Sequence, residues 1–269
     1  MILDQLVAAT KRRIALRKAD CPLSTLRTRV LTDLTSPTTG EAFYKALRKP
    51  ELSFICEIKR ASPSKGLIAP DFPYLEIAKT YYSAGAEVIS VLTEPDFFLG
   101  KDQYLSDISQ SVPTPLLRKD FVIDEYMIYE AKAMGASGIL LICAILTDEQ
   151  LADYLTIAEG LGLSVLVETH NEEEVERALR AKAKMIGVNN RNLRDFRVDP
   201  ETCIRLRSMV PKDVVFVAES GIQTPEDLAK LNQQGIDAVL IGEAFMRSTD
   251  PSALLRALHK AVGRRSESL

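Results

Sequence analysis

Short apolar runs recur along the chain at a regular spacing. They are rich in β-branched and aliphatic residues and are almost continuously hydrophobic, as strands buried on both faces of a parallel sheet must be. Eight such runs occur, with ends 20 to 33 residues apart: SFICEIK, EVISVL, PLLRK, GILLI, SVLVE, MIGV, VVFVAE and AVLIG. We therefore predict eight strands of a parallel sheet.

Each predicted strand is followed by a stretch with apolar residues at helical spacing. The eight stretches are 74–85, 102–111, 124–135, 147–162, 171–183, 200–209, 224–235 and 251–262. Thr147 and Thr224 are placed to cap helix starts, and glycines follow several helix ends. These glycines are Gly85, Gly135, Gly162 and Gly235. Eight alternations of strand and helix predict an α/β fold, the (β/α)8 TIM barrel.

A doubly wound open sheet is the alternative architecture. Such a sheet usually has fewer strands and carries a glycine-rich G-x-G-x-x-G fingerprint after its first strand. Here the first strand is followed by RASPSKG, which lacks that pattern. The number of strands and the loop sequence both favour the barrel.

Residues 1–50 precede the first strand and form a predicted N-terminal helical extension. Its pattern indicates a helix from about Asp4 to Ala19, a polar connector, and a short helix around Glu41 to Leu47. We predict a single domain over 1–269, with the barrel at 51–262 and a tail at 263–269. The extension is expected mainly to cover the bottom or flank of the barrel, and a lid or substrate contact near Leu52 is the alternative.

Composition and charge narrow the classes of binding partner that we expect. The chain is 46% hydrophobic and 26% charged with a net charge of -3, which is typical of a globular protein and argues against nucleic acid or an anionic membrane as a partner. The four cysteines are scattered without a C-x-x-C pair, and His170 and His259 are the only histidines. We therefore expect no metal site and no disulfide framework. With no apolar run of membrane-spanning length and no signal-peptide pattern, we expect a cytoplasmic protein.

Five predicted strands end in polar or charged residues. These ends are Glu57 to Lys59, Arg118 to Asp120, Glu168, Asn189 to Arg191, and Glu219 to Ser220. In a (β/α)8 barrel the C-terminal strand ends form the catalytic face, so we predict that the active site lies there.

Two lysines and a glutamate form the predicted centre of that site. Strand alternation places Glu57 and Lys59 on one side, pointing into the barrel, and an internal ion pair without function is the alternative interpretation. Lys119 taken alone is equally well explained as a loop charge. With Glu168 from the fifth strand, however, the lysines can supply an acid and a base to opposite sides of one small substrate. Desolvation or a second cation can tune the protonation of such a lysine.

A phosphate site is predicted after the seventh and eighth strands. Gly221 and Gly242 stand at these strand ends and leave backbone N–H groups accessible, and a helix beginning near Glu243 would direct its positive end at a phosphate. Other residues nearby remain ambiguous. Ser62 and Ser64 either bind a ligand or shape a turn, and Phe98 with its neighbour Phe97 either clamps an aromatic ring or packs on the extension.

His170 lies two residues after Glu168 and resembles a catalytic histidine. No serine or cysteine is placed to complete a recognisable triad with it. We therefore assign it to the turn into the next helix.

Several motifs together resemble one family, indole-3-glycerol-phosphate synthase of tryptophan biosynthesis. In order along the chain they are CEIKRASPSKG, LTEPDFFLG, LLRKDF, LVETH, IGVNNRNL, AESGI and LIGEAFM. The resemblance covers essentially the whole chain, including the helical extension. It implies a carboxy-lyase that closes 1-(2-carboxyphenylamino)-1-deoxyribulose 5-phosphate to indole-3-glycerol phosphate, with loss of carbon dioxide and water and without cofactor or metal. We expect a monomer acting on this small phosphorylated substrate.

The resemblance also implies roles for individual residues. It places the general acid on Lys119, the general base on Glu168 and a second catalytic lysine on Lys59, and the division of steps between the lysines stays open. Glu57 and Asn189 match supporting polar residues. The residues that match substrate contacts are Ser62, Arg191, Ser220 and Gly221. Gly242 and Glu243 match the phosphate loop, where some members have serine instead of Glu243, which favours backbone N–H groups as phosphate ligands. The residues expected around the anthranilate ring are Phe98, Phe121 and Leu140.

Two other functions compete with this one. A sugar-phosphate isomerase such as phosphoribosylanthranilate isomerase typically needs a cysteine or aspartate in its acid–base pair, and the nearest cysteine, Cys56, is expected to face the helices. A barrel that binds phosphate without catalysis is the second alternative. The intact set of Lys59, Lys119 and Glu168 argues against it.

Overall fold

The computed structural model describes residues 2–33, 39–192, 195–222 and 224–262. The predicted tail 263–269 and part of the predicted connector, 34–38, lie outside the described residues. Within the described ranges no helix combines the length and apolar character that crossing a membrane requires.

Eight parallel strands close into a barrel, which confirms the predicted fold. Around the barrel their order is β1, β10, β9, β8, β7, β6, β5 and β4. Their bounds are β1 Ser53–Ile58, β4 Val88–Leu92, β5 Leu116–Lys119, β6 Gly138–Ile142, β7 Ser164–Thr169, β8 Met185–Asn189, β9 Val215–Glu219 and β10 Ala238–Ile241. Each predicted strand agrees with these bounds to within one residue at either end.

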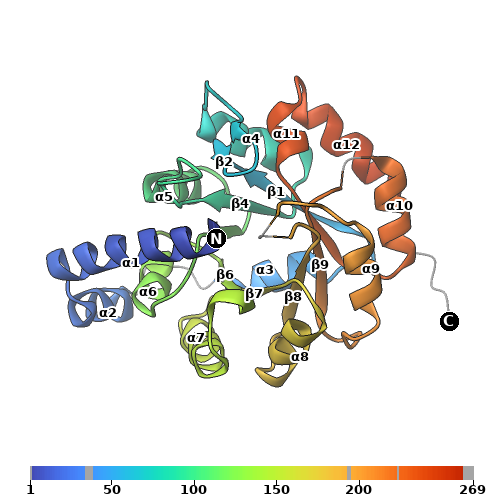
Figure 1. Cartoon of the computed structure of the whole chain (residues 1–269). Helices are drawn as coiled ribbons and strands as arrows, with labels where there is room; N and C mark the ends of the chain where they lie inside the picture. Colours follow the sequence, from blue (N-terminus) through green and yellow to red (C-terminus); the bar gives the residue numbers. More distant parts are fainter. Residues whose placement is uncertain (1, 34–38, 193–194, 223, 263–269) are drawn as a thin grey trace.

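Helices surround the barrel on the outside (Figure 1). They are α4 Tyr74–Ala84, α5 Asp102–Ser111, α6 Tyr126–Ala133, α7 Asp148–Gly160, α8 Glu172–Arg180, α9 Glu201–Arg207, α10 Pro225–Gln233, α11 Glu243–Arg247 and α12 Pro251–Val262, with a 3-10 turn η1 at Cys143–Ile145. A small hairpin, β2 Ala61–Ser62 and β3 Gly66–Leu67, follows β1. Thr147 and Thr224 form capping boxes at the starts of α7 and α10, as predicted.

The strands are apolar on both faces because each face packs against a different layer. On β1, Cys56 and Ile58 belong to the outer core between strands and helices, whereas Ile55 belongs to the inner core of the barrel. Both layers exclude water, which explains the nearly continuous hydrophobic runs in the sequence. Glu57, next to Ile58, therefore points inward as the alternation predicts.

The N-terminal extension contains one helix more than predicted. Its helices are α1 Ile2–Asp20, α2 Leu23–Thr32 and α3 Gly40–Leu47. The prediction of a polar connector was wrong for the ten residues of α2, which bury only Leu26 and Val30. Because so short a helix depends on tertiary packing, here against α6, its sequence pattern alone is weak.

The extension contacts both ends of the barrel. Phe43 and Leu47 of α3 are fully buried in the inner core, with Phe43 against Gly138 at the start of β6, so α3 covers the bottom as expected. α1 covers the flank along much of its length, where Arg17 pairs with Glu130 of α6, but its first turns reach the opposite end of the barrel, with Leu6 buried in the inner core (Figure 1). Leu52, the predicted contact point, instead packs in the outer core.

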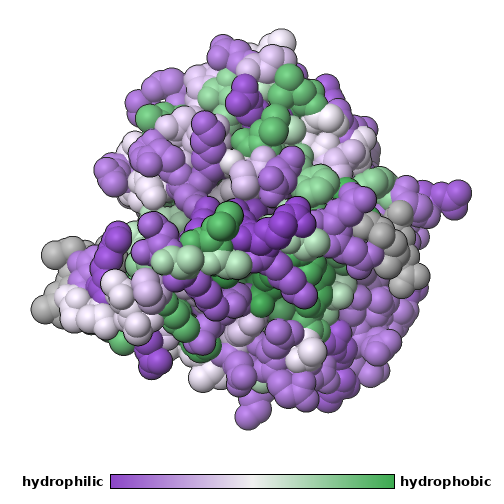
Figure 2. All heavy atoms as spheres, turned by 60° about the vertical axis from the view of Figure 1, so that its left-hand side comes forward, coloured by the Kyte–Doolittle hydropathy of each residue, from purple (hydrophilic) through white to green (hydrophobic). Residues whose placement is uncertain are grey.

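Ion pairs attach α1 to the barrel. The guanidinium of Arg13 lies 2.9 Å from Asp120, and the ammonium of Lys18 lies 2.6 Å from Asp124. Arg17 lies 2.8 Å from Glu130. On the side where α1 comes forward, hydrophilic residues dominate the surface, with apolar residues gathered in smaller patches (Figure 2).

Candidate active site

A cavity of about 860 Å³ opens at the C-terminal ends of the strands. All fourteen residues that the sequence singled out line it: Glu57, Lys59, Ser62, Phe98, Lys119, Phe121, Leu140, Glu168, Asn189, Arg191, Ser220, Gly221, Gly242 and Glu243. Ser64, which the sequence left ambiguous, also lines the cavity, as do Ile2, Leu3 and Leu6 of α1. The N-terminal helix is therefore part of the site.

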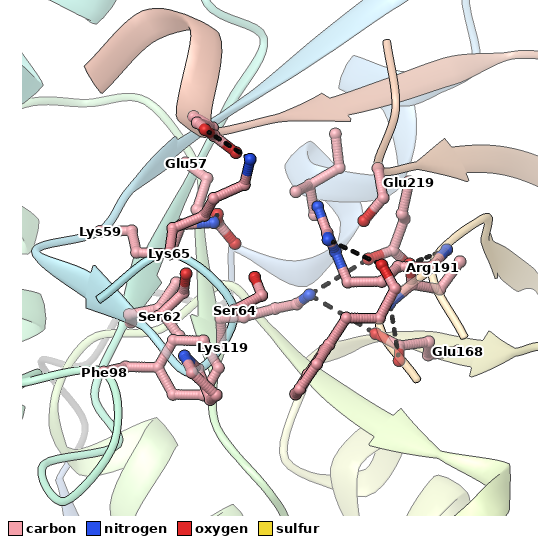
Figure 3. A pocket seen from close by; sticks show the side chains of 18 of the residues that line it. Glu57, Lys59, Ser62, Ser64, Lys65, Phe98, Lys119, Glu168, Arg191 and Glu219 are labelled. Atoms are coloured by element: carbon pink, nitrogen blue, oxygen red, sulfur yellow. Dashed lines mark hydrogen bonds and ion pairs between the residues drawn. The ribbon is translucent and has the colours of Figure 1, made fainter. Parts of the chain in front are cut away.

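Lys119 stands in the middle of the cavity, between two carboxylates (Figure 3). Its Nζ lies 3.1 Å from Oε2 of Glu219 and 3.5 Å from Oε2 of Glu168. Burial favours the neutral amine, but Glu219, Glu168 and Glu57 outweigh it and raise the pKa of Lys119 above its ordinary value. The sequence suggested that desolvation or a second cation would tune this lysine. In the structure the charges of the neighbouring carboxylates outweigh desolvation, so Lys119 stays protonated.

Glu57 and Lys59 form a close ion pair at the end of β1, as strand alternation predicts. Burial raises the pKa of Glu57, but the charges of Lys59 and Lys119 prevail, so the net shift is downward. A Cβ at Gly242 would collide with the Glu57 carboxylate. The glycine at the end of β10 therefore makes room for an ionised carboxylate that lies under the influence of both lysines.

Glu168, at the end of β7, has partners on both carboxylate oxygens. Its Oε1 accepts a hydrogen bond of 3.2 Å from Nδ2 of Asn189 and lies 3.3 Å from Nε2 of His170, while Oε2 faces Lys119. Burial opposes ionisation, but Lys119, His170 and Asn189 together lower the pKa of Glu168 to about 2. Glu168 is therefore ionised while Lys119 carries its proton.

Glu219 and His170, which contact Lys119 and Glu168, were absent from the predicted set. Glu219 ends β9, and its charge at a strand end was visible in the sequence, but only the structure shows its contact with Lys119. Burial and the neighbouring Glu168 raise the pKa of Glu219 to about 7, against the opposing charge of Lys119. A Cβ at Gly187 would meet its Oε1, so this glycine leaves space for the carboxylate. The second residue is His170, which occupies the predicted turn but also reaches Glu168.

The loops after β9 and β10 form one side of the cavity. Ser220 and Gly221 adopt left-handed backbone conformations with φ of 66° and 77°. Gly242 precedes α11, whose first residue Glu243 is paired with Lys65 of the β2–β3 hairpin at 3.5 Å and with Arg247 at 3.1 Å. The cations neutralise the carboxylate at the place where the sequence predicts a phosphate.

Apolar side chains form another part of the wall. The rings of Phe98 and Phe121 have centroids 6.0 Å apart, and Leu140 of β6 lies in the same lining. Phe97 packs against the inner core beside them. Cys56 is fully buried in the outer core on the other side of β1, as expected. The cavity thus combines an apolar surface that fits a flat ring with a charged centre and a glycine-rich end.

Known proteins are similar to this chain in sequence or in fold. A family model described as indole-3-glycerol phosphate synthase matches residues 3–258. Proteins of that name from Ruminiclostridium cellulolyticum and Lacticaseibacillus paracasei are 53% and 54% identical to this chain over 258 residues, which cover 96% of this chain and 98% of each relative.

Among solved structures, 3-hexulose-6-phosphate synthase from Salmonella typhimurium matches with a TM-score of 0.66 at 14% identity, over 80% of this chain and 100% of that chain. KGPDC from Streptococcus mutans matches with a TM-score of 0.63 at 11% identity, over 80% of this chain and 99% of that chain. At such low identity these two likenesses concern the barrel fold alone.

Proposed function

This chain belongs to the indole-3-glycerol phosphate synthase family, and we propose that it closes 1-(2-carboxyphenylamino)-1-deoxyribulose 5-phosphate to indole-3-glycerol phosphate, releasing carbon dioxide and water. The observation that carries the proposal for the site is the position of Lys119. It is a largely buried cation that projects into the cavity between two carboxylates.

Lys119 is the general acid in this proposal. Ring closure places developing negative charge on the ribulose carbonyl oxygen, and a fixed ammonium both stabilises that charge and donates the proton. The surrounding carboxylates make Lys119 a weak acid in the free protein. Proton transfer is therefore expected to accompany ring closure, when the oxygen becomes basic.

Glu168 is the general base, and its strength is coupled to the state of Lys119. While Lys119 is charged, Glu168 has a pKa of about 2 and is a poor base. Once Lys119 has given its proton to the substrate, the main charge that lowers this pKa is gone, and Glu168 becomes more basic. Lys59, oriented by Glu57, is the cation that holds the substrate carboxylate before it leaves as carbon dioxide.

The remaining residues bind the two ends of the substrate. The anthranilate ring packs against Phe98, Phe121 and Leu140, and backbone N–H groups of the loops at Gly221 and Gly242 hold the phosphate. Lys65 and Arg247 offset the charge of Glu243, so its side chain does not repel the phosphate. Further polar contacts come from Ser62, Arg191, Ser220 and Asn189.

We also propose that the chain works as a cytoplasmic monomer and as one domain over 1–269, with the extension at 1–50 and the barrel at 51–262. The extension contributes Phe43 to the inner core at the N-terminal end of the barrel and Leu6 to the cavity wall. Neither the extension nor the barrel is therefore complete without the other. The expected partner is the small phosphorylated substrate, without cofactor, metal, nucleic acid or membrane.

The direct test is to incubate the purified protein with the carboxyphenylamino-deoxyribulose phosphate and follow the fluorescence of the indole product. We expect turnover without added metal or cofactor. An isomerase would instead convert phosphoribosylanthranilate, and a binding protein would bind the substrate without consuming it. Either of these results, with no indole formed, would overturn the proposal.

A further inference from the structure

His170 makes contacts that a turn residue does not need. Its Nε2 lies 3.3 Å from Oε1 of Glu168, and its Nδ1 lies 3.0 Å from Oε2 of Glu174 on α8. The side chain is 15% exposed and does not line the cavity. The imidazole is thus a largely buried bridge between a carboxylate inside the site and one outside it.

Glu174 is itself held in place by the start of α8. One oxygen accepts the backbone N–H of His170 at 2.9 Å, and the other accepts Nδ2 of Asn171 at 3.2 Å. Asn171 in turn caps the helix by accepting the backbone N–H of Glu174. The imidazole therefore has a rigid support on the side away from the substrate.

We propose that His170 is a positioning residue for the reaction, holding Oε1 of Glu168 so that Oε2 stays turned toward Lys119 and the substrate. The inference rests on the proposed function, because it assumes that Glu168 is the base. Lys119 lies closer to Glu219, at 3.1 Å, than to Glu168, at 3.5 Å, so His170 and the amide of Asn189 share the task of orienting Glu168 through Oε1.

The charge of His170 matters most after Lys119 has donated its proton. Lys119 is then neutral, and the buried Glu168 would be left without a cation beside it, which strongly disfavours its ionised form. A cationic His170 does not take part in that proton transfer. It therefore keeps Glu168 ionised and available as a base in the later step.

The groups around the imidazole favour its cationic form. Burial lowers the pKa of His170, but Glu168 and Glu174 outweigh burial and raise it to about 10. Among the other neighbours of the pair, Asn189 on β8 is uncharged, and Lys119 lies on the far side of Glu168. On η1 the thiol of Cys143 has a pKa raised by burial to about 12 and stays neutral.

The kinetic test compares His170→Ala with His170→Gln. We expect His170→Ala to lower kcat about 10- to 100-fold, the scale of a misplaced catalytic group, with KM changed less than about threefold. His170→Gln keeps a polar N–H group without the charge and should recover only part of kcat. Both variants lack the charge, so the acid limb of the pH profile of kcat/KM should move to higher pH in both.

His259→Gln is the matched control. His259 faces a carboxylate, Glu87, at 3.9 Å, but it lies on α12 outside the cavity, so its loss should leave kcat and the pH profile unchanged. Circular dichroism and thermal unfolding establish that the variants are folded. A folded His170→Ala or His170→Gln variant with kcat within about twofold of wild type and an unmoved acid limb would overturn the inference.

A titration of the histidine rings by NMR separates this inference from the proposed function. In the wild-type protein we expect the His170 ring to remain protonated well above pH 7, and Glu168→Gln should lower its pKa. If the ring titrates identically in both proteins, the pairing with Glu168 is wrong even when the wild-type protein forms indole. If Glu168→Gln lowers the pKa of the His170 ring but the wild-type protein forms no indole, the proposed function fails and the pairing stands.

Discussion

The two ends of the barrel use the same eight strands for opposite purposes. At the N-terminal end Phe43 and Leu47 of α3 fill the interior with apolar side chains and close it. At the C-terminal end, Glu57, Lys119, Glu168 and Glu219 face a cavity of about 860 Å³. Buried charges are costly unless they are paired, and three carboxylates here share the charge of Lys119. The N-terminal end of the barrel therefore contributes apolar burial to stability, whereas the C-terminal end places charged groups around the cavity.

Shortening a side chain at the N-terminal end of the barrel is expected to have the largest effect on stability and tests whether the two ends have separate roles. Phe43→Ala should lower the free energy of unfolding by about 3–5 kcal/mol, because a fully buried ring is replaced by a cavity. In the folded variant kcat should stay within about twofold of wild type. Urea unfolding and a turnover assay measure the two effects. The control is Lys45→Ala on the same helix, whose exposed side chain should contribute little. If the folded Phe43→Ala variant also lost much of its kcat, the two ends of the barrel would not be separable.

Removing the ammonium group of Lys119 tests the C-terminal end of the barrel. Lys119→Ala should lose at least about 100-fold in turnover, the scale of a general acid, while the protein remains folded. Steady-state kinetics and circular dichroism measure this, and Lys79→Ala on the exposed surface of α4 serves as the matched control. Near-normal turnover of Lys119→Ala would mean that the acid is a different residue.

The pH dependence of the unfolding free energy should show what it costs to bury charged groups at the C-terminal end of the barrel. Glu219 has a pKa of about 7 in the folded protein, above the ordinary value of 4.5, so between these values the folded state holds a proton that the unfolded chain has lost. The contribution of this group to stability therefore falls as pH rises from 4.5 to 7, by up to about 1 kcal/mol per pH unit.

The measurement is the difference in unfolding free energy between wild type and Glu219→Gln at several pH values. We expect the wild-type protein to lose stability relative to the variant across this window. A difference that stays constant with pH would contradict the raised pKa.

The smallest effect is expected where α1 joins the C-terminal end of the barrel. Leu6→Ala removes apolar surface from the cavity wall and should raise KM about fivefold, equivalent to about 1 kcal/mol, with little change in kcat. Leu16→Ala is the control, because Leu16 lies on the same helix but is 74% exposed. Equal KM values in the two variants would show that α1 covers the site without contributing to binding.

The sequence alone determined the barrel and most residues of the candidate site. Strands buried on both faces must be apolar throughout, so their positions are visible as runs, and a charge at a strand end stands out against them. Parallel strands bring all such ends to one face. For this reason Lys59, Lys119 and Glu168 were predicted to meet, although they lie on different strands.

Only the tertiary structure decided which charged groups touch and what covers them. Lys119 and Glu219 are 100 residues apart, and their contact depends on the size and closure of the barrel, which no local pattern records. The same is true of α1, whose sequence predicts a helix but does not say which end of the barrel it contacts. His170 was assigned correctly to a turn by its local sequence, while its contacts with Glu168 and Glu174 arise from how β7 and α8 meet in space.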